Sequence, residues 1–352
     1  MYKISTPPRP NQQLSQKIHI MQLICCILVV YIHYNLTSEF PTVCGFNTNW
    51  IQYFIRHILG SLAVPTFFCI SGYLFFQGIE TMKDVKEKMK KRAKTLIIPY
   101  LIGCFICFII TLFSQEEPIE FLQSKSVAKQ LFYIFFPRYN FPLWYVRNLI
   151  LIVLISPLLF YVRQLGFLVV LGIPAFILST VHFPYVICGQ FIASVYWFML
   201  GAYFFWKPFN KYLSFALLAY VIASLFFFTP KGWIEVETSL WQIFGTTAGV
   251  VGLWAFYDII ISKKFNLKDH RFLKFCCLST FFVYVYHICL LGKVCRLCTN
   301  ICGSGEIGSL VTFLFAPLVT FCILVALFWI MNKYIPQVLS VILGGRVPNL
   351  KS

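Results

Sequence analysis

The sequence predicts an all-α membrane protein, a polytopic bundle of about ten transmembrane helices with both termini in the cytoplasm. Of its 352 residues, 59% are hydrophobic and only 12% are charged, and the mean hydropathy is +0.78. Soluble globular proteins usually carry about 25% charged residues. The composition therefore excludes an ordinary soluble protein. It also means that the net charge of +17 reflects the placement of basic residues along the chain rather than a nucleic-acid partner.

The predicted helices are runs of roughly 20 mostly apolar residues, the length that crosses a hydrocarbon core of about 30 Å. They cover residues 19–38, 57–77, 95–114, 141–162, 166–182, 190–206, 212–228, 239–261, 272–291 and 307–332. We expect three parts: a cytoplasmic N-terminal segment (1–18), one transmembrane domain (19–332) and a cytoplasmic tail (333–352). No cleavable signal peptide is expected, because no small-residue cleavage site follows the first helix.

The predicted connections on one side of the membrane carry many more basic residues than those on the other side. The richest predicted connection, a cationic loop before the third helix, carries Lys83, Lys86, Lys88, Lys90, Lys91, Arg92 and Lys94. Arg163, Lys207 and the terminal segments fall on the same side, whereas most glutamates fall on the other. The positive-inside rule makes the basic side cytoplasmic, where it also meets anionic membrane lipid.

Most of the 14 cysteines lie within the predicted helices, where a free thiol packs as a small apolar group. The exception is KVCRLCTNIC, expected to be an outer loop, with Cys295, Cys298 and Cys302. Whether two of these cysteines form a disulfide is left open. A metal site is not expected, because a fourth ligand at a recognisable spacing is missing.

One ionisable residue stands near the outer end of the first predicted helix, in LICCILVVYIHYN. His33 is a candidate functional residue, because polar groups at membrane depth are costly without a partner. Gln22 lies 11 residues earlier, about 20° away around the helix, and His19 lies about 40° to the other side. The three predict one polar stripe. The alternative is that His33 and, more readily, His19 cap the helix at the interfaces.

Two more titratable side chains are expected at the depth of His33. Arg147 lies in the first turns of the fourth predicted helix, and His287 lies near the outer end of the ninth. A buried arginine should face the bundle interior. The alternatives are an interfacial anchor for Arg147 and an imidazole at the interface, beside Tyr284 and Tyr286, for His287.

Six segments in register resemble the acyltransferase 3 family of bacterial membrane O-acyltransferases, over nearly the whole chain. They are LVVYIH, VPTFFCISGYLFF, KRAKTLIIPYL, PLWYVRNLILIVLISPL, VYWFMLGAYF and STFFVYVYH. The resemblance matches the family's first-helix histidine to His33. Departures occur at Gln22, usually basic in the family, at Thr95 in the paired basic motif, and at Asn148, commonly Asp.

The resemblance implies an enzyme that transfers an acyl group, most simply acetyl, to a hydroxyl of a cell-surface glycan or lipid-linked sugar. The enzyme would lie in the bacterial cytoplasmic membrane, with acetyl-CoA as the donor substrate and no metal. A histidine suits the removal of a hydroxyl proton at neutral pH, and a guanidinium suits a developing oxyanion or a phosphate. We therefore assign His33 as the base, with Arg147 and His287 beside it.

Further residues are expected to bind the donor or the substrate. Lys91, Arg92 and Lys94, with Gln22, are the expected donor-binding residues, although any cytoplasmic connection is basic. A second group is expected either to touch substrate or to pack helices: Ser71, Gly72, Trp144, Asn148 and Tyr284. Small residues such as the first two commonly allow close helix packing.

Two rival functions remain open at the level of sequence. A transporter or flippase for a lipid-linked or amphipathic substrate would also need polar residues at depth, but the two halves of the chain lack the corresponding broken segments that are typical of transporters. The second rival function is that of an inactive relative that serves as a partner for another envelope enzyme. It is suggested by the departures from the family pattern at Gln22, Thr95 and Asn148.

Overall fold

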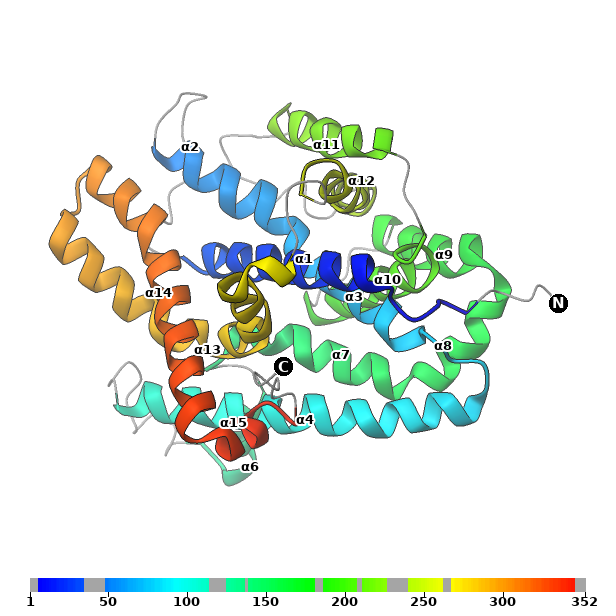
Figure 1. The fold of residues 1–352 in the computed structure, drawn as a ribbon, viewed down its shortest axis with the longest axis horizontal. Helices are drawn as coiled ribbons and strands as arrows, with labels where there is room; N and C mark the ends of the chain where they lie inside the picture. The colour runs from blue at the N-terminus through cyan, green and yellow to red at the C-terminus, as the bar shows by residue number, and fades with distance from the viewer. Residues whose placement is uncertain are drawn as a thin grey trace. The chain divides into compact units, whose positions relative to one another are not determined.

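The computed structural model describes residues 6–34, 48–113, 125–136, 139–180, 186–207, 211–226, 240–261 and 267–345, and all its regular structure there is helical (Figure 1). The α-helices are α1 (Gln12–Ile32), α2 (Thr48–Tyr53), α3 (Ala63–Phe76), α4 (Met82–Phe113), α6 (Val127–Phe135), α7 (Trp144–Leu154), α8 (Ser156–Val162), α9 (Phe167–Thr180), α10 (Val186–Phe204), α11 (Phe215–Phe226), α12 (Leu240–Phe256), α13 (Arg271–Cys302), α14 (Glu306–Tyr334) and α15 (Pro336–Ile342). The all-α prediction is confirmed for this part of the chain.

Several of these helices are long and apolar enough to cross a membrane. Within the described ranges five qualify, namely Gln12–Ile32, Trp50–Phe76, Met82–Phe113, Arg271–Cys302 and Glu306–Tyr334, and a bent pair would make a sixth. Shorter apolar helices occupy Phe167–Leu178, Tyr212–Leu225 and Ile243–Ile259, where the sequence predicts further spans. A multi-pass membrane protein is thus supported, while the count of about ten spans and the cytoplasmic termini stay predictions.

The first helix is shifted from its predicted position. It was expected over 19–38 but begins at Gln12 and ends at Ile32, so His33 is the first residue after its last turn. The polar segment before the apolar run is helical because Asn11 accepts a hydrogen bond at 2.8 Å from the backbone N–H of Leu14, a side-chain cap at the helix start. The helical geometry that relates His19 to Gln22 therefore holds, but it does not extend to His33.

Two predicted loops are helical, which corrects the sequence analysis. The cationic stretch Lys83–Lys94 forms the first turns of α4. The three cysteines of KVCRLCTNIC lie in the last turns of α13, and none of them is in a disulfide. Lysine, arginine, leucine and methionine favour helices, so a spanning helix extends beyond its apolar part without a break.

The predicted single span over 141–162 is broken. A 3₁₀ turn, Phe141–Leu143, leads into α7, and α7 and α8 meet at an angle of 65° around Ile155. Pro157 explains the bend, because it lacks a backbone N–H and its ring clashes with the preceding turn.

The chain forms two compact units, described separately here. The first comprises the described parts of Met1–Ile32, Thr37–Met89 and Leu154–Cys277, and the second those of His33–Leu36, Lys90–Val153 and Leu278–Ser352. In the first unit, α3 and α10 pack in direct backbone contact. A Cβ on Gly72 would overlap the carbonyl oxygen of Phe198, and one on Gly201 would overlap that of Cys69. Gly72 is therefore a packing residue, as small residues commonly are between membrane helices.

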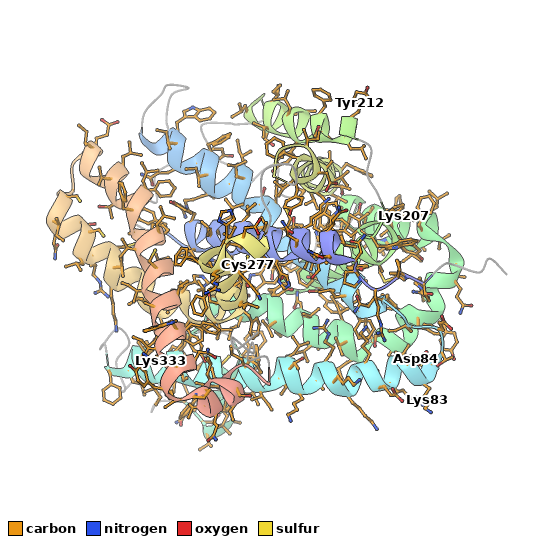
Figure 2. All side chains as sticks on the ribbon, in the orientation of Figure 1. Lys83, Asp84, Lys207, Tyr212, Cys277 and Lys333 are labelled. Atoms are coloured by element: carbon orange, nitrogen blue, oxygen red, sulfur yellow. A yellow bond between two sulfur atoms is a disulfide. The ribbon has the colours of Figure 1, made fainter. Side chains whose placement is uncertain are left out.

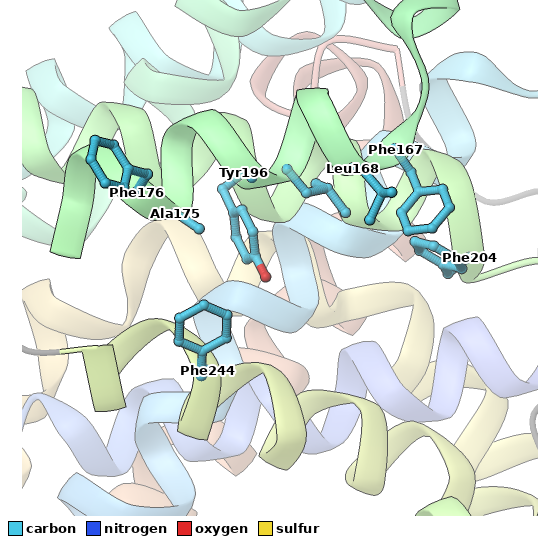
Figure 3. A pocket seen from close by; sticks show the side chains of 9 residues that line it. Phe167, Leu168, Ala175, Phe176, Tyr196, Phe204 and Phe244 are labelled. Atoms are coloured by element: carbon cyan, nitrogen blue, oxygen red, sulfur yellow. The ribbon is translucent and has the colours of Figure 1, made fainter.

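The first unit also contains an apolar groove and an ion pair between a buried lysine and an exposed aspartate. Lys17 lies 2.7 Å from Asp258 and 4.4 Å from the ring centre of Trp254. The groove, of about 400 Å³, lies between α9, α10 and α12 (Figure 3). It is lined by Phe167, Leu168, Leu171, Gly172, Ala175, Phe176, Tyr196, Phe204 and Phe244. The lining is apolar apart from the hydroxyl of Tyr196.

Candidate active site

Two histidines from opposite ends of the sequence meet in the second unit. The Nδ1 atom of His33 lies 3.4 Å from Nε2 of His287, and the two rings meet edge to face with their centres 5.1 Å apart. His287 is fully buried, whereas His33 is half-buried. Two of the three residues that the sequence analysis expects at one depth are thus in direct contact.

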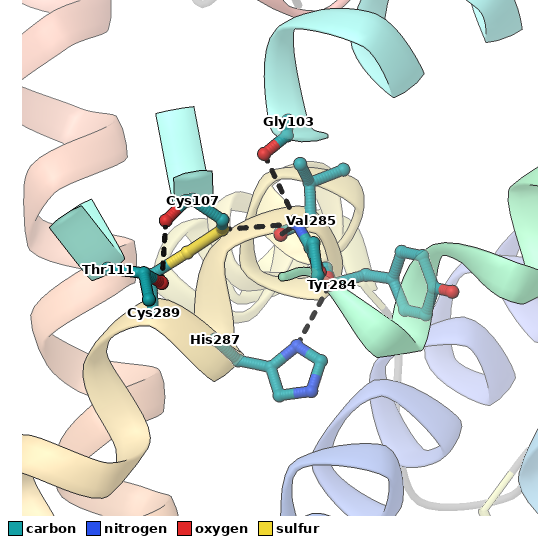
Figure 4. Close-up of a disulfide and its surroundings, with 8 residues drawn as sticks. Gly103, Cys107, Thr111, Tyr284, Val285, His287 and Cys289 are labelled. Carbon is teal, nitrogen blue, oxygen red and sulfur yellow. Dashed lines mark hydrogen bonds between the residues drawn. A yellow bond between two sulfur atoms is a disulfide. The ribbon is translucent and has the colours of Figure 1, made fainter. Parts of the chain in front are cut away.

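The hydrogen bonds define the tautomers of the pair. The Nδ1 atom of His287 lies 2.8 Å from the carbonyl oxygen of Tyr284, one turn earlier in α13 (Figure 4). A carbonyl only accepts, so this Nδ1 carries the proton, and Nε2 of neutral His287 is an acceptor. His33 must then donate through its Nδ1–H. Its own Nε2 is consequently the unprotonated nitrogen, the form of imidazole that a general base requires.

The position of His33 is set by its neighbours, although it lies beyond the end of α1. The next residue, Tyr34, is fully buried, its ring packs edge to face on Phe313 at 5.0 Å, and its hydroxyl lies 3.5 Å from the carbonyl oxygen of Ser309. On its other side, His33 meets the ring of Phe141 at 6.2 Å. These contacts hold the imidazole against α13.

Tyr284 connects the histidine pair to the start of α7. Its hydroxyl donates a hydrogen bond to the carbonyl oxygen of Pro142, and its ring packs edge to face on that of Tyr145 at 5.6 Å. Tyr145 in turn interacts electrostatically with Arg92 of α4. Tyr284 is thus a positioning residue in this structure, and two tyrosines lie between Arg92 and His287.

Asn140 joins the two long helices of the same unit. Its side-chain amide donates to the carbonyl oxygens of Val285 at 2.9 Å and Gly103 at 3.4 Å, and it lies 3.2 Å from the sulfur of Cys107 (Figure 4). Cys107 of α4 forms a disulfide with Cys289 of α13. The segment that carries His287 is therefore tied to α4 by an amide and a covalent bond.

Arg147 lies on α7, one residue before its hydrogen-bond acceptor. Its Nε and Nη2 atoms lie 3.2 Å and 3.1 Å from the side-chain oxygen of Asn148, and its guanidinium lies 5.0 Å from the ring centre of Phe136. An amide oxygen orients the guanidinium without neutralising its charge. Arg147 thus remains a cation in the unit that holds the histidine pair, but the structure provides no direct contact with either imidazole.

The expected donor-binding residues of α4 differ in exposure. Lys91 and Lys94 are exposed, while Arg92 is half-buried and faces Tyr145. The hydroxyl of Thr95 lies 3.2 Å from the carbonyl oxygen of Arg92. A Cβ on Gly344 would come within 2.8 Å of the Cα of Thr95, so the C-terminal segment packs closely at this position. The close approach, together with the positive φ of Gly344, favours glycine at position 344.

The remaining predicted residues are half-buried. Gln22, His19 and Ser71 belong to the first unit, and Trp144 is the first residue of α7. Their roles stay predictions. Across the part of the chain that the structure describes, no group of three or more His, Cys, Asp or Glu side chains could hold a metal ion.

The sequence analysis missed Asn140, Tyr145 and the disulfide. Asn140 directly precedes Phe-Pro, a context typical of turns, which is a weak signal for a capping role. The disulfide had no sequence signal, because 182 residues separate Cys107 from Cys289 and both lie in apolar helices.

The fold and the histidine pair define a class of protein, the multi-pass helical membrane proteins with ionisable side chains packed among their helices. Within that class, the family described as acyltransferase domain matches residues 16–332, and the chain belongs to this acyltransferase 3 family. Among curated proteins, the succinoglycan biosynthesis protein ExoH of Rhizobium meliloti (strain 1021) is 24% identical over 359 residues, covering 96% of this chain and 94% of the relative. No solved structure matches the chain. The family supports an acyltransferase over the transporter alternative.

Proposed function

We propose that this protein is an O-acyltransferase of the bacterial cytoplasmic membrane, which transfers an acetyl group from acetyl-CoA to a hydroxyl of a cell-surface glycan or lipid-linked sugar. The observation that supports it most directly is the pairing of His33 with His287, because the pair leaves a basic nitrogen on His33. Membership of the family and the succinoglycan role in the relative's name support acyl transfer and a glycan acceptor.

In this mechanism Nε2 of His33 removes the proton from the acceptor hydroxyl. The hydroxyl oxygen then attacks the thioester carbonyl of the donor, a carbon–oxygen bond forms, and the carbon–sulfur bond breaks. The leaving thiolate takes the proton back from the His33 imidazolium, so protons and electrons balance. General base catalysis of this kind contributes about 10²- to 10⁴-fold to the rate.

His287 acts through His33 rather than on substrate. The Nε2 atom of His287 accepts the Nδ1–H of His33 and so holds His33 in the tautomer whose own Nε2 is basic. When His33 becomes an imidazolium, the same nitrogen still accepts its Nδ1 proton, so the charged state keeps a partner. His287 is thus a positioning residue in the proposal.

Arg147 supplies a cation whose charge is not cancelled by its hydrogen-bond acceptor, Asn148. We assign it either to the oxyanion that forms on the thioester carbonyl or to a phosphate of donor or lipid carrier. Arg92 contributes to donor binding and is half-buried, whereas Lys91 and Lys94 are exposed.

The test is mass spectrometry of surface glycans and lipid-linked sugars from cells with and without the gene, complemented by the wild type or by His33→Ala. We expect the wild type to restore an acyl mass on one glycan and His33→Ala to fail at equal protein abundance. The acyl mass identifies the donor group, so a mass other than acetyl would correct that part of the proposal. A glycan that changes in amount or location without any change in acylation contradicts the proposed function.

A further inference from the structure

A second arginine, outside the candidate active site, is buried with two of its guanidinium nitrogens lacking a hydrogen-bond acceptor. Arg163 follows α8 in the first unit, is 5% exposed, and has Nε and Nη1 buried with no partner. Its guanidinium lies 4.9 Å from the ring centre of Phe76 and 5.7 Å from that of Phe160. No carboxylate among the described residues pairs with it.

The ring contacts compensate only part of the cost of this burial. A cation over an aromatic face gains only a modest attraction. Each buried donor without an acceptor costs more than that, and an ionised group without a counter-charge costs more still. Arginine does not avoid this cost by deprotonation. The arrangement is therefore typical of a cation that has an anionic ligand in the functional protein.

The backbone at Arg163 is fixed while its side chain is held only by ring contacts. The hydroxyl of Tyr203 donates a hydrogen bond at 2.7 Å to the carbonyl oxygen of Arg163. A ligand that draws the guanidinium toward the surface would thus break no side-chain hydrogen bond to a described residue.

Two more cations contact residues that are adjacent in the chain to residues in contact with Arg163. Lys88 donates a hydrogen bond at 3.0 Å to the carbonyl oxygen of Gln77, next in the chain after Phe76. Lys207 lies 5.3 Å from the ring centre of Phe204, the neighbour of Tyr203 (Figure 2). The charge pattern of the sequence predicts that Lys88, Arg163 and Lys207 all lie on the cytoplasmic side.

We propose that Arg163 binds a phosphate ester, with Lys88 and Lys207 contributing positive charge at the rim of the site. The planar guanidinium presents paired N–H donors that match two phosphate oxygens. Coenzyme A and an anionic phospholipid headgroup both carry this group on the cytoplasmic side. The first source rests on the proposed acyl transfer, and the second does not.

The experiment measures thermal unfolding of the purified, delipidated full chain at a fixed scan rate. The probes are coenzyme A, inorganic pyrophosphate, phosphatidylglycerol and phosphatidylcholine, with wild type, Arg163→Met and Arg163→Lys. A ligand that binds only the folded state raises the unfolding midpoint. Lys83→Met is the matched control, because it removes an exposed charge from the same unit (Figure 2).

We expect phosphatidylglycerol or coenzyme A to raise the midpoint of the wild type and of Lys83→Met, and phosphatidylcholine to do so less. Arg163→Met should abolish the shift and, without ligand, unfold no earlier than the wild type, because it removes an unpaired buried charge. If Arg163→Met does not fold, Arg163→Lys should weaken binding at least about tenfold, because it loses the paired donors.

A shift with coenzyme A and pyrophosphate identifies the donor as the source, and a shift with phosphatidylglycerol alone identifies the lipid. Failure of every probe to shift the wild type, or equal shifts in the wild type and the Arg163 variants, overturns the proposal. Because the measurement needs no turnover, an inactive enzyme that still shows the Arg163-dependent shift would contradict the proposed function but not this site.

Discussion

The Nε2 atom of His287 lies 3.4 Å from Nδ1 of His33, although 254 residues separate the two histidines in the chain. The Nδ1–H of His287 is taken by the carbonyl oxygen of Tyr284. This order of donors and acceptors gives the two imidazoles different roles. His33 is left with a basic nitrogen, whereas both nitrogens of His287 are occupied.

The first prediction concerns His33. His33→Ala should lower acyl transfer by about 10²- to 10⁴-fold, because the general base is lost. The measurement is transfer of labelled acetyl from acetyl-CoA to endogenous glycan in membrane vesicles. Tyr34→Phe is the control, because it keeps the ring contact with Phe313 and removes only a hydroxyl 3.5 Å from its acceptor. If His33→Ala retains at least half of the wild-type rate, His33 is not the base.

The second prediction separates two substitutions of His287. His287→Gln can present an oxygen to Nδ1–H of His33, whereas His287→Leu cannot. We expect His287→Leu to lower kcat by about 10- to 100-fold with little change in KM, and His287→Gln to retain most of the rate. A purely structural role would instead follow residue volume, so equal losses in both variants would count against a tautomer role. The amount of folded protein is compared by size-exclusion chromatography.

The sequence predicted the class of fold well because hydropathy is a local property. Runs of apolar residues gave helices near the ten expected positions, including the short ones. The helix ends were less predictable: the basic start of α4 and the cysteine-containing end of α13 continue as helix, because helix formers do not stop where the apolar run stops. The bend at Ile155 had a signal in Pro157 that the length criterion alone does not use.

The site was predictable in its residue types and only partly in its contacts. The positions of His33 and His287 along their predicted helices place them at one expected depth. Depth alone does not determine which side chains touch or which nitrogen carries a proton. Those facts depend on two backbone carbonyls, that of Tyr284, which accepts from His287, and that of Val285, which accepts from Asn140. Backbone carbonyls exist at every residue, so no sequence pattern marks the ones that become acceptors. Asn148 was read as a departure from the family, and its side chain holds Arg147.

The third prediction concerns the acceptor of Arg147. Asn148→Asp should preserve both hydrogen bonds and strengthen them, because charge-assisted bonds are roughly twice as strong as neutral ones. Asn148→Leu removes both and should lower the transfer rate about 10-fold or more through misplacement of the guanidinium. Labelled-acetyl transfer in vesicles measures both. If Asn148→Leu is as active as the wild type while Arg147→Met is inactive, orientation by Asn148 has no role.

The fourth prediction tests the packing role of Gly72. Gly72→Ala should lower the yield and the unfolding midpoint, because a methyl group overlaps the carbonyl oxygen of Phe198 and overpacking costs about 1 to 3 kcal/mol. Gly172→Ala is the matched control in the same unit, because a Cβ there meets nothing within 4 Å. It should be neutral or slightly stabilising, since alanine has a higher helix propensity than glycine. Equal midpoints for both variants would show that α3 and α10 are less closely packed.

The last prediction concerns the disulfide between Cys107 and Cys289, which links α4 to the helix of His287 across 182 residues of chain. Under denaturing, non-reducing conditions a maleimide reagent should leave these two thiols unmodified, and reduction should expose both. Cys107→Ser should lower stability by about 2 to 4 kcal/mol, the usual contribution of a disulfide that closes a long loop. Cys302→Ser, at an exposed thiol outside any disulfide, should lose one labelled site without loss of stability. Labelling of Cys107 and Cys289 before reduction would show that α4 and α13 are held together there by Asn140 and packing alone.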